Sequence, residues 1–248
     1  SKSIHVMTEA MKLAYADRTK WLGDPDFVDV PTKQLSSKTY AKQRRQLISE
    51  TRAKASKLIL EGAPFTILES DETTHFSVID KDGNAVSNTY TLNFAYGSGH
   101  VVPGTGVILN NEMDDFVSKA GIPNAYGLIG GNYNSIEPKK RMLSSMSPTL
   151  IFKNGKIFMA TGSPGGSRII TSVLQTIINV IDHKLNIADA THAPRFHHQW
   201  LPDKLFIEQG FSKDTINNLK EKGHNIKQSK RFGGTQSIVF KNNVFYGS

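Results

Sequence analysis

The stretch Thr73-Thr74-His75-Phe76-Ser77 contains the best candidate for a nucleophile in this chain. A threonine hydroxyl is a poor nucleophile and needs a base at hydrogen-bond distance. If the chain were cut between Glu72 and Thr73, the new α-amino group, with a pKa near ~8, would be that base on the same residue. Taken alone, a Thr-Thr-His tripeptide is more often the exposed start of a strand. We therefore treat Thr73 as a hypothesis that other residues must support.

A second segment that could take part in chemistry is the glycine-rich stretch Gly162-Ser163-Pro164-Gly165-Gly166-Ser167. It precedes a helix that we expect from Arg168 to His183. A Gly-Gly pair at a helix N-terminus exposes free backbone N–H groups in a positive local potential, which suits an oxyanion or a carboxylate. The alternative interpretation is a tight turn without function.

Three other kinds of site are not expected. Gly97-Ser98-Gly99 and Gly104-Thr105-Gly106 lack the strand-loop-helix context of a dinucleotide site. His197 and His198 are adjacent, point apart in an extended chain, and have no third ligand at matching spacing, so no metal or cofactor is predicted. The net charge of +8 makes nucleic-acid binding a function to consider. However, the basic residues are scattered without an aromatic stripe, and we do not expect a nucleic-acid partner.

Length and composition allow one large domain or two small ones. The 248 residues are 38% hydrophobic and 21% charged, which is ordinary for a globular protein. The longest apolar run, Ile169 to Ile181, is interrupted by polar residues and is shorter than the ~20 residues of a membrane span. Disulfides and thiolate metal sites are excluded because the sequence has no cysteine.

The elements around Thr73 follow from periodicity and turn signals. A helix is expected from about residue 3 to Trp21, with Ile4, Met7, Met11 and Ala14 on its buried face. A second helix should begin at Ser37 as N-cap and run to Ile48. Residues 50–72 lack clear periodicity and read as a linker.

From His75 the pattern changes to short strands. Alternation around Lys81-Asp82-Gly83-Asn84 predicts a hairpin up to Leu92, with Thr73 at its leading edge. Asn154-Gly155 predicts a second hairpin. The other expected elements are a short buried strand at 107–109, a long irregular segment at 118–137 of the kind that often serves as a lid, helices at 187–192 and 212–222, and strands at 205–208, near 226 and at 236–241.

Four sequence blocks together resemble the γ-glutamyltranspeptidases, also called glutathione hydrolases, of the bacterial type. The blocks are Thr73 to Val78, Asn110 to Asp115, Lys140 to Thr149 and Thr161 to Arg168. The resemblance covers essentially the whole chain. By this resemblance, residues 1–72 correspond to the C-terminal part of the large subunit, ending in a linker, and residues 73–248 to the small, catalytic subunit, both sharing one fold.

The resemblance implies an α/β (α+β) fold, namely the αββα sandwich of the N-terminal-nucleophile hydrolases, of which this chain would be an incomplete part. It also implies autocatalytic cleavage between Glu72 and Thr73. The freed Thr73 would form an acyl-enzyme with glutathione or other γ-glutamyl compounds. The glutamyl group would pass to water, an amino acid or a dipeptide, in the periplasm or outside the cell.

Individual residues match the family's functional positions. Thr91 would hydrogen-bond the nucleophile, and Gly165 and Gly166 would form the oxyanion hole. Asp115 would be the main partner of the substrate ammonium, a pairing that suits a carboxylate. The remaining matches are Asn93 and Glu112 for the ends of the glutamyl group, Ser144 and Ser145 for its α-carboxylate, and Tyr126 for the tyrosine of a lid loop.

Two alternatives and one gap accompany this interpretation. A related glutaryl or cephalosporin acylase shares the fold and nucleophile, but its substrate has no α-amino group to pair with Asp115. A catalytically silent basic binding domain is the alternative from another class. In the family an arginine for the α-carboxylate comes from the large-subunit region upstream, so that region is expected as a partner. Without its helices, apolar surface of the sheets should be partly uncovered.

Overall fold

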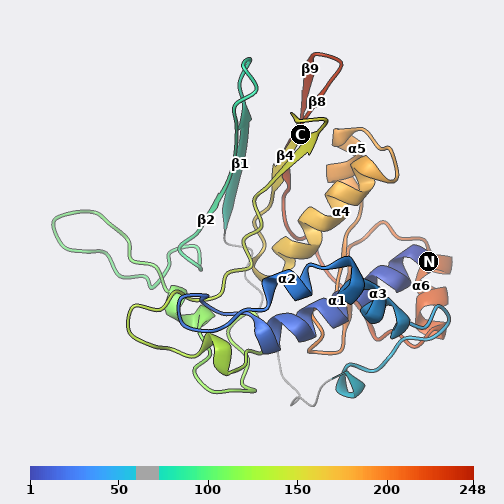
Figure 1. Ribbon diagram of the computed structural model, residues 1–248, viewed down its shortest axis with the longest axis horizontal. Coiled ribbons are helices and arrows are strands. Elements are labelled where there is room, and N and C mark those ends of the chain that lie inside the picture. The colour runs from blue at the N-terminus through green and yellow to red at the C-terminus, as the bar shows by residue number, and fades with distance from the viewer. Residues whose placement is uncertain (60–72) are drawn as a thin grey trace. The chain divides into compact units, whose positions relative to one another are not determined.

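The computed structural model describes residues 1–59 and 73–248 (Figure 1). The chain forms two compact units, each assembled from separate parts of the sequence. The first unit comprises Ser1–Glu69, Met113–Ser144 and Phe196–Lys230, and the second comprises Ser70–Glu112, Ser145–Arg195 and Arg231–Ser248. The predicted boundary after residue 72 concerns cleavage of the chain and stays a prediction.

Helices and a small sheet build the first unit. Its helices are α1 (Lys2–Trp21), α2 (Thr32–Leu35), α3 (Lys38–Gln46) and α6 (Lys213–Glu221), with 3-10 turns η1 (Ser56–Leu58) and η3 (Asn132–Asn134). Strand β6 (Leu205–Ile207) pairs antiparallel with β5 (Phe196–His197) and parallel with β7 (Ile226–Gln228). Met11 packs against Phe196, Leu205, Ile207 and Leu219 to form the core.

Local signals set the helix ends in this unit. The hydroxyl of Ser37 accepts a hydrogen bond from the Tyr40 N–H at 3.1 Å, and Ser212 caps α6 in the same way through Thr215. Gly223, just after α6, has φ +94°, the left-handed conformation that glycine adopts without strain. The predicted helices at 3–21, 37–48 and 212–222 are therefore confirmed to within a few residues.

The predicted face of α1 is confirmed in part, because Met11 lies in the core and Ile4 and Met7 pack against it. Ala14 is exposed, however, and the helix also buries His5, Glu9 and Lys12. The Lys12 Nζ pairs with Glu9 Oε1 at 2.7 Å and donates to the Lys54 carbonyl at 2.8 Å. Apolar periodicity could not predict that these polar side chains are buried, because their burial requires hydrogen-bond partners from other segments of the chain.

This polar cluster fastens the segment after α3 to α1. Glu9 Oε2 accepts the Lys54 N–H at 3.0 Å. His5 Nε2 donates to the Ser49 carbonyl at 2.8 Å, and its Nδ1 shares a 2.7 Å hydrogen bond with His224 Nε2. Because the Ser49 carbonyl can only accept, His5 carries its proton on Nε2 and His224 is the donor in the shared bond.

The second unit consists of a hairpin, a four-stranded sheet and two helices. Strand β1 (Thr74–Ile79) pairs antiparallel with β2 (Ala85–Tyr90). The sheet has the order β3 (Thr149–Lys153), β4 (Lys156–Gly162), β8 (Gln236–Lys241) and β9 (Val244–Gly247). The 3-10 turn η4 (Gly166–Arg168) leads into α4 (Ile169–Ile181), and α5 (Ile187–His192) follows.

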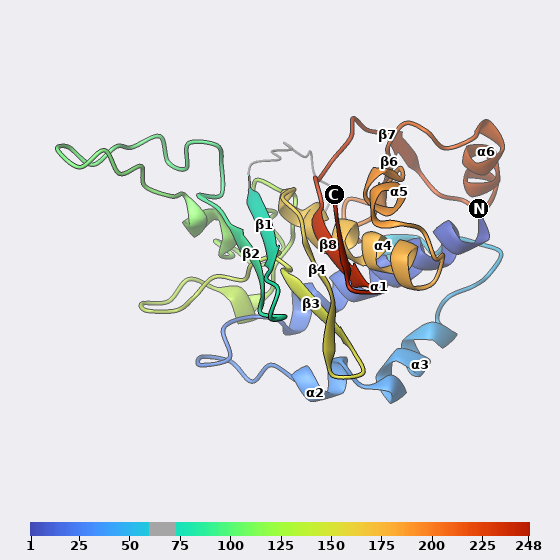
Figure 2. The same ribbon diagram turned by 90° about the horizontal axis from the view of Figure 1, so that it is seen from above.

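These parts of the second unit lie in layers. The sheet lies between the β1–β2 hairpin and helices α4 and α5 in both views (Figures 1 and 2). Met159 of β4 and Val239 of β8 pack against Val180, Ile187 and Ala190 of the helices. The mixed α/β class predicted from the sequence is confirmed. The hairpin, the sheet and the helices correspond to two β layers and one α layer of the expected αββα sandwich.

Side chains fix the hairpin onto the sheet. Ser77 Oγ donates to the Gln236 carbonyl at 3.0 Å, and Ser87 Oγ donates to the Thr161 carbonyl at 2.9 Å. The ring of His75 occupies the space beside Gly162, where a Cβ would lie 2.1 Å from Cε1 of the imidazole. A glycine is therefore required at the end of β4 for the hairpin to approach.

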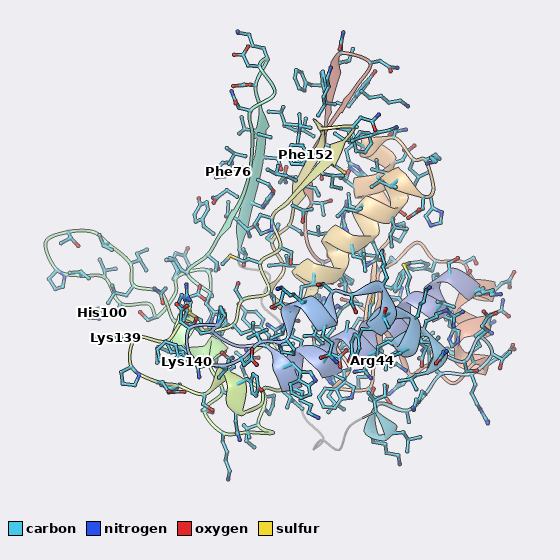
Figure 3. The ribbon with its side chains drawn as sticks, viewed as in Figure 1. Arg44, Phe76, His100, Lys139, Lys140 and Phe152 are labelled. Carbon is cyan, nitrogen blue, oxygen red and sulfur yellow. The ribbon has the colours of Figure 1, made fainter. Side chains whose placement is uncertain are left out.

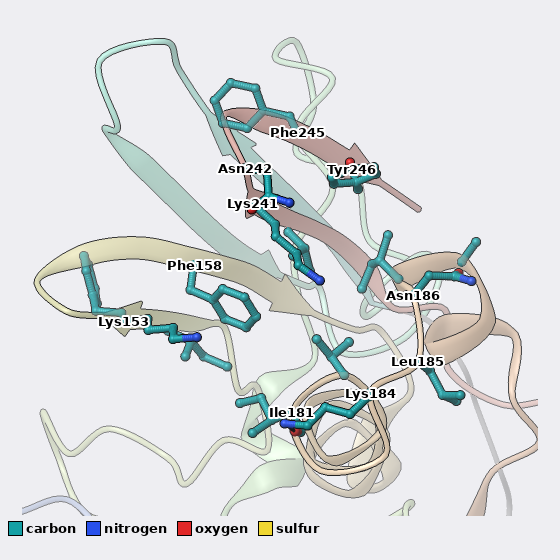
Figure 4. Close-up of a pocket in the computed structure, with 17 residues that line it drawn as sticks. Lys153, Phe158, Ile181, Lys184, Leu185, Asn186, Lys241, Asn242, Phe245 and Tyr246 are labelled. Atoms are coloured by element: carbon teal, nitrogen blue, oxygen red, sulfur yellow. Dashed lines mark hydrogen bonds between the residues drawn. The ribbon is translucent and has the colours of Figure 1, made fainter.

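Parts of the sheets are uncovered. Phe76 on β1 and Phe152 on β3 are 44% and 59% exposed (Figure 3). A pocket of ≈ 940 Å³ opens between the C-terminal end of α4 and the strands, with Phe158 and Val239 among its apolar lining and Lys241 beside them (Figure 4). Helices α4 and α5 therefore cover the sheet only in part, as the resemblance led us to expect.

Other local predictions have mixed outcomes. The Asn154-Gly155 hairpin is confirmed, with φ values of +53° and +75° at the turn. The predicted buried strand at 107–109 is wrong, because Val107 is 55% exposed and only Ile108 forms an isolated bridge, to Val101. Strands β5 and β9 were not predicted. Residues 118–137 are irregular apart from η3, as expected.

We expect Gly162→Ala to destabilise the second unit. The added methyl would overlap three atoms of the His75 ring, which is held by Thr89 Oγ1 at 2.7 Å and Ser77 Oγ at 3.1 Å. Overpacking of this kind costs about 1–3 kcal/mol, measurable by urea unfolding. Gly247→Ala is the matched control, since its Cβ meets nothing within 4 Å. Equal stability of the two variants would contradict the packing account.

A pH dependence follows from the buried histidines of the first unit. Burial, assisted by the positive charge of Lys12, lowers the pKa of His224 to about 3. The unfolded state, with a pKa near ~6.5, binds this proton more readily, so the contribution is present above that pH and is lost as pH falls toward 3.

The free energy of unfolding of His224→Gln should therefore fall less steeply with acid than that of the parent. The difference in slope should approach at most about 1.4 kcal/mol per pH unit, measured by urea unfolding between pH 6.5 and 4. His100→Gln, at an exposed loop position of the second unit, should leave the slope unchanged. Parallel curves for the His224 variant and the parent would refute the assignment.

Candidate functional site

The β1–β2 register brings Thr73 and Thr91 together. Thr74 pairs with Tyr90, so the residues just before β1 and just after β2 face each other at the open end of the hairpin. The Thr73 hydroxyl donates to Thr91 Oγ1 at 3.2 Å. A proton donated along this bond leaves the lone pairs of Thr73 Oγ1 available for attack on a carbonyl. Strand pairing thus places Thr91 beside the candidate nucleophile.

Thr91 is itself fixed by the chain that follows. Its Oγ1 also accepts the Asn93 N–H at 2.9 Å. Asn93 is buried with φ +75°, and its Nδ2 donates to the Asn111 carbonyl at 3.2 Å. Asn111 Oδ1 in turn accepts the Phe94 N–H at 3.1 Å. Asn93 is therefore held next to the segment that leads to Glu112, which is also buried.

His75 is close to Thr73 in sequence but is not placed to be its base. Burial lowers the pKa of His75, so the ring is neutral. Ser77 Oγ gives its own proton to the Gln236 carbonyl, so His75 Nε2 must donate to Ser77 and Nδ1 must accept from Thr89 Oγ1. Both ring nitrogens are engaged by residues other than Thr73. A base for Thr73 must come from elsewhere, as the α-amino hypothesis requires.

The two predicted oxyanion glycines adopt conformations that need glycine. Gly165 has φ +128° and Gly166 has φ +51°, at the point where β4 passes into η4 and α4. A Cβ on Gly165 would lie 3.3 Å from the Cα of Gly233. Ser163 Oγ accepts the Gly234 N–H at 3.1 Å, which ties the loop to the segment before β8. The loop is thus a rigid backbone turn at a helix start.

Asp115, Tyr126 and Ser144 belong to the first unit. Asp115 is half-buried at the end of η2 (Glu112–Asp115), and Asn124 Nδ2 lies 3.5 Å from its Oδ1. Burial lowers the pKa of Arg18, and the charge of Asp115 opposes this shift. Asp115 therefore already lies in the field of a cation. Tyr126 is buried rather than projecting, and its carbonyl accepts from Gln199 Nε2 at 3.0 Å.

The structure thus groups the predicted residues by unit. Thr73, Thr91, Asn93, Glu112, Ser145, Gly165 and Gly166 belong to the second unit, and Asp115, Tyr126 and Ser144 to the first. Ser144 is exposed in a segment without regular secondary structure. Glu72, the predicted residue before the cleaved bond, lies outside the described residues. None of the predicted site residues lines the ≈ 940 Å³ pocket.

The described residues contain one cluster with metal-ligand types, His5, Glu9 and His224, whose ligand atoms lie within 4.8 Å of one another. Its geometry does not suit zinc. Two imidazole nitrogens at ~2.0–2.1 Å from a tetrahedral ion would be well over ~3 Å apart, whereas His5 Nδ1 and His224 Nε2 are 2.7 Å apart. Glu9 is also paired with Lys12. The cluster is a hydrogen-bonded network.

The adjacent histidines His197 and His198 serve separate contacts. His197 Nε2 bonds Gln199 Oε1 at 2.9 Å, and His198 Nε2 bonds Asp203 Oδ1 at 3.2 Å. Burial lowers the pKa of His198, partly offset by Asp203.

A sequence model described as gamma-glutamyltranspeptidase matches residues 1–248. The glutathione hydrolase proenzyme of Escherichia coli (strain K12) is 55% identical over 239 residues, which are 96% of this chain and 41% of that protein. The chain belongs to the γ-glutamyltranspeptidase family. It spans about two fifths of the length of the curated relatives it matches.

Solved structures of γ-glutamyltranspeptidases extend the likeness to the fold. An acivicin-inhibited gamma-glutamyltranspeptidase aligns with a TM-score of 0.70 and 55% identity over 71% of this chain and 96% of that chain. A cephalosporin acylase from Bacillus halodurans aligns with a TM-score of 0.78 and 29% identity over 98% of this chain and 42% of that chain. The predicted N-terminal-nucleophile hydrolase fold is thereby confirmed.

Two residues of this γ-glutamyltranspeptidase chain gained importance only from the structure. His75 lies in one of the sequence blocks that resemble the family, yet it packs against Gly162, at the end of a strand far away in the sequence. Asn134, in the irregular segment, links two other segments through its side chain. The only sequence signal for Asn134 was the polar, glycine-rich character of its surroundings.

In the part of the chain that the structure describes, no helix is both long and apolar enough to cross a membrane.

Proposed function

We propose that this chain carries the nucleophile and substrate-binding residues of a γ-glutamyl transferase and hydrolase that acts on glutathione and related γ-glutamyl amides. The observation that carries the proposal is the hydrogen bond from the Thr73 hydroxyl to Thr91 Oγ1. It sits at the hairpin end that follows the proposed cleavage site. A structural threonine pair would not require the surrounding blocks to match a family of hydrolases over the full chain.

Maturation would use the same hydroxyl as catalysis. Thr73 Oγ1 attacks the Glu72 carbonyl carbon, the amide nitrogen of Thr73 takes up a proton as the C–N bond breaks, and an ester forms. Water then hydrolyses this ester, which restores the hydroxyl and leaves a free α-amino group on Thr73. With a pKa near ~8 that amine can serve as the base.

In the reaction itself, Thr73 Oγ1 attacks the γ-carbonyl carbon of the substrate. The α-amino group accepts the hydroxyl proton and passes it to the leaving amine as the amide C–N bond breaks. The oxyanion of each tetrahedral intermediate would receive hydrogen bonds from the N–H groups of Gly165 and Gly166. Water or the amine of an amino acid or dipeptide then attacks the glutamyl ester and regenerates Thr73.

Substrate recognition would divide between cationic and anionic ends. Asp115 would pair with the α-ammonium, with Asn93 and Glu112 near the glutamyl group and Ser144 and Ser145 donating to the α-carboxylate. Tyr126 would belong to the loop that borders the site. A region upstream of this chain would supply the carboxylate-binding arginine and cover the exposed apolar surface of the sheets. By the family resemblance, we also propose that the activity takes place in the periplasm or outside the cell.

The glutaryl or cephalosporin acylase alternative is kept because a cephalosporin acylase shares the fold. Asp115 separates the two, since a glutaryl group has no ammonium to pair with it. A basic scaffold without catalysis would neither cleave itself nor turn over either substrate.

Thr73→Ala in the full-length precursor should abolish cleavage after Glu72, because no hydroxyl remains to attack. Thr73→Ser should still cleave, since it keeps the hydroxyl. Intact mass after purification distinguishes one chain from two. Thr74→Ala, which alters the neighbouring hydroxyl in β1, is the matched control and should cleave. Efficient cleavage of the Thr73→Ala precursor would remove the basis of the proposal.

Asp115→Asn should weaken binding of γ-glutamyl substrates and leave maturation intact, because it removes the charge that meets the ammonium. Loss of one charge-assisted contact should cost about 2–4 kcal/mol in kcat/KM, expressed mainly in KM. Steady-state hydrolysis of a γ-glutamyl anilide measures it. Asp114→Asn is the control, since an amide oxygen can still accept the Ala125 N–H that Asp114 Oδ2 binds at 3.0 Å. An unchanged KM in Asp115→Asn would show that another group binds the amine.

A further inference from the structure

We propose that Asn134 is a positioning residue that holds the segments bearing Asp115 and Ser144 in one fixed arrangement, so that the ammonium and carboxylate of a substrate can bind together. The inference rests on the proposed function, which gives Asp115 and Ser144 their roles. It adds a residue that touches no substrate in that scheme.

Asn134 is the last residue of η3 and is 5% exposed. Its Nδ2 donates to the backbone carbonyl of Asp115 at 2.6 Å, and its Oδ1 accepts the Leu143 N–H at 3.0 Å. Its own carbonyl accepts the Val117 N–H at 2.9 Å. One side chain therefore joins the end of η2 to the residue directly before Ser144, within the first unit.

The orientation of this amide is determined by its partners. A backbone carbonyl can only accept and a backbone N–H can only donate, so Nδ2 must face Asp115 and Oδ1 must face Leu143. The Asn134 side chain is buried, and loss of either bond would leave the Asp115 carbonyl or the Leu143 N–H without this partner. Aspartate at this position could keep the bond to Leu143 but could not donate to Asp115.

Other contacts anchor each of the two segments. The Asp24 carboxylate accepts from the Arg141 N–H at 2.8 Å and from its Nη2 at 2.6 Å, which anchors the chain two residues before Leu143. In the segment that bears Asp115, Asn124 Nδ2 lies 3.5 Å from Asp115 Oδ1. The side chain of Asn134 bonds to both segments.

The chemistry of the substrate explains why such a link matters. The ammonium and carboxylate of a γ-glutamyl group are attached to the same carbon, so their spacing cannot adapt to the protein. A site that misplaces one binding group by ~1 Å loses much of the benefit of both. We therefore expect loss of the link to weaken substrate binding more than it slows the chemistry at Thr73.

The test uses the full-length precursor with two substitutions, Asn134→Ala and Asn134→Asp. Both should still cleave after Glu72, which serves as the check on folding. Asn134→Ala should raise KM for a γ-glutamyl anilide about tenfold or more, with a smaller change in kcat. Asn132→Ala, at an exposed position of the same turn, is the matched control and should keep the parent KM.

A second substrate separates the two bonds. A glutaryl anilide retains the carboxylate and lacks the ammonium. Asn134→Asp, which loses only the donor to Asp115, should impair the γ-glutamyl anilide more than the glutaryl anilide. Asn134→Ala should impair both. Equal impairment of both substrates by Asn134→Asp, or an unchanged KM in Asn134→Ala, would overturn the proposal.

Hydrogen exchange distinguishes failure of this inference from failure of the proposed function. The Leu143 amide should exchange faster in Asn134→Ala and stay protected in Asn134→Asp, while the Val117 amide, bonded to the Asn134 backbone, should change little. If the parent precursor hydrolyses neither anilide, the proposed function fails, and the Leu143 protection still decides whether the link exists. Unaltered Leu143 exchange in Asn134→Ala would refute the link itself.

Discussion

The position of Thr73 depends on how the β1–β2 hairpin is held against the four-stranded sheet. The His75 ring fills the space where Gly162 has no side chain, and two serine hydroxyls of the hairpin bond carbonyls of β4 and its neighbour β8. Antiparallel pairing then sets Thr73 opposite Thr91, and the Asn93 N–H donates to Thr91 Oγ1. A one-residue slip in that register would turn alternate side chains to the other face of the hairpin and separate the two hydroxyls.

The same contact removes the obvious competitor for the role of base. His75 is neutral, and both of its nitrogens are used in holding the hairpin in place. Its structural role therefore leaves a threonine without a side-chain base from this residue, which is the situation in which an N-terminal amine is useful. The hydrogen bonds of His75 that hold the hairpin are thus also the reason why the proposed chemistry needs another base.

The first unit buries polar groups beside its apolar core. Glu9 and Lys12 on α1 satisfy the backbone of Lys54, and Asn134 satisfies backbone groups of Asp115 and Leu143. Such bonds are directional, so they fix the course of irregular segments in a way that nonspecific apolar packing does not. Long connections without regular structure can then present side chains at defined positions.

Sequence alone determined the features that depend on neighbouring residues: the caps at Ser37 and Ser212, the Asn154-Gly155 turn, the hairpin after Thr73 and the ordered blocks that identify the family. Tertiary structure alone decided that α1 also buries polar side chains, that the segment at 107–109 is exposed, that His75 packs on Gly162 and that Asn134 joins two distant segments. The physical reason is that turns and caps are made by residues a few positions apart, whereas the burial of a polar side chain is favourable only if partners from elsewhere in the chain complete its hydrogen bonds.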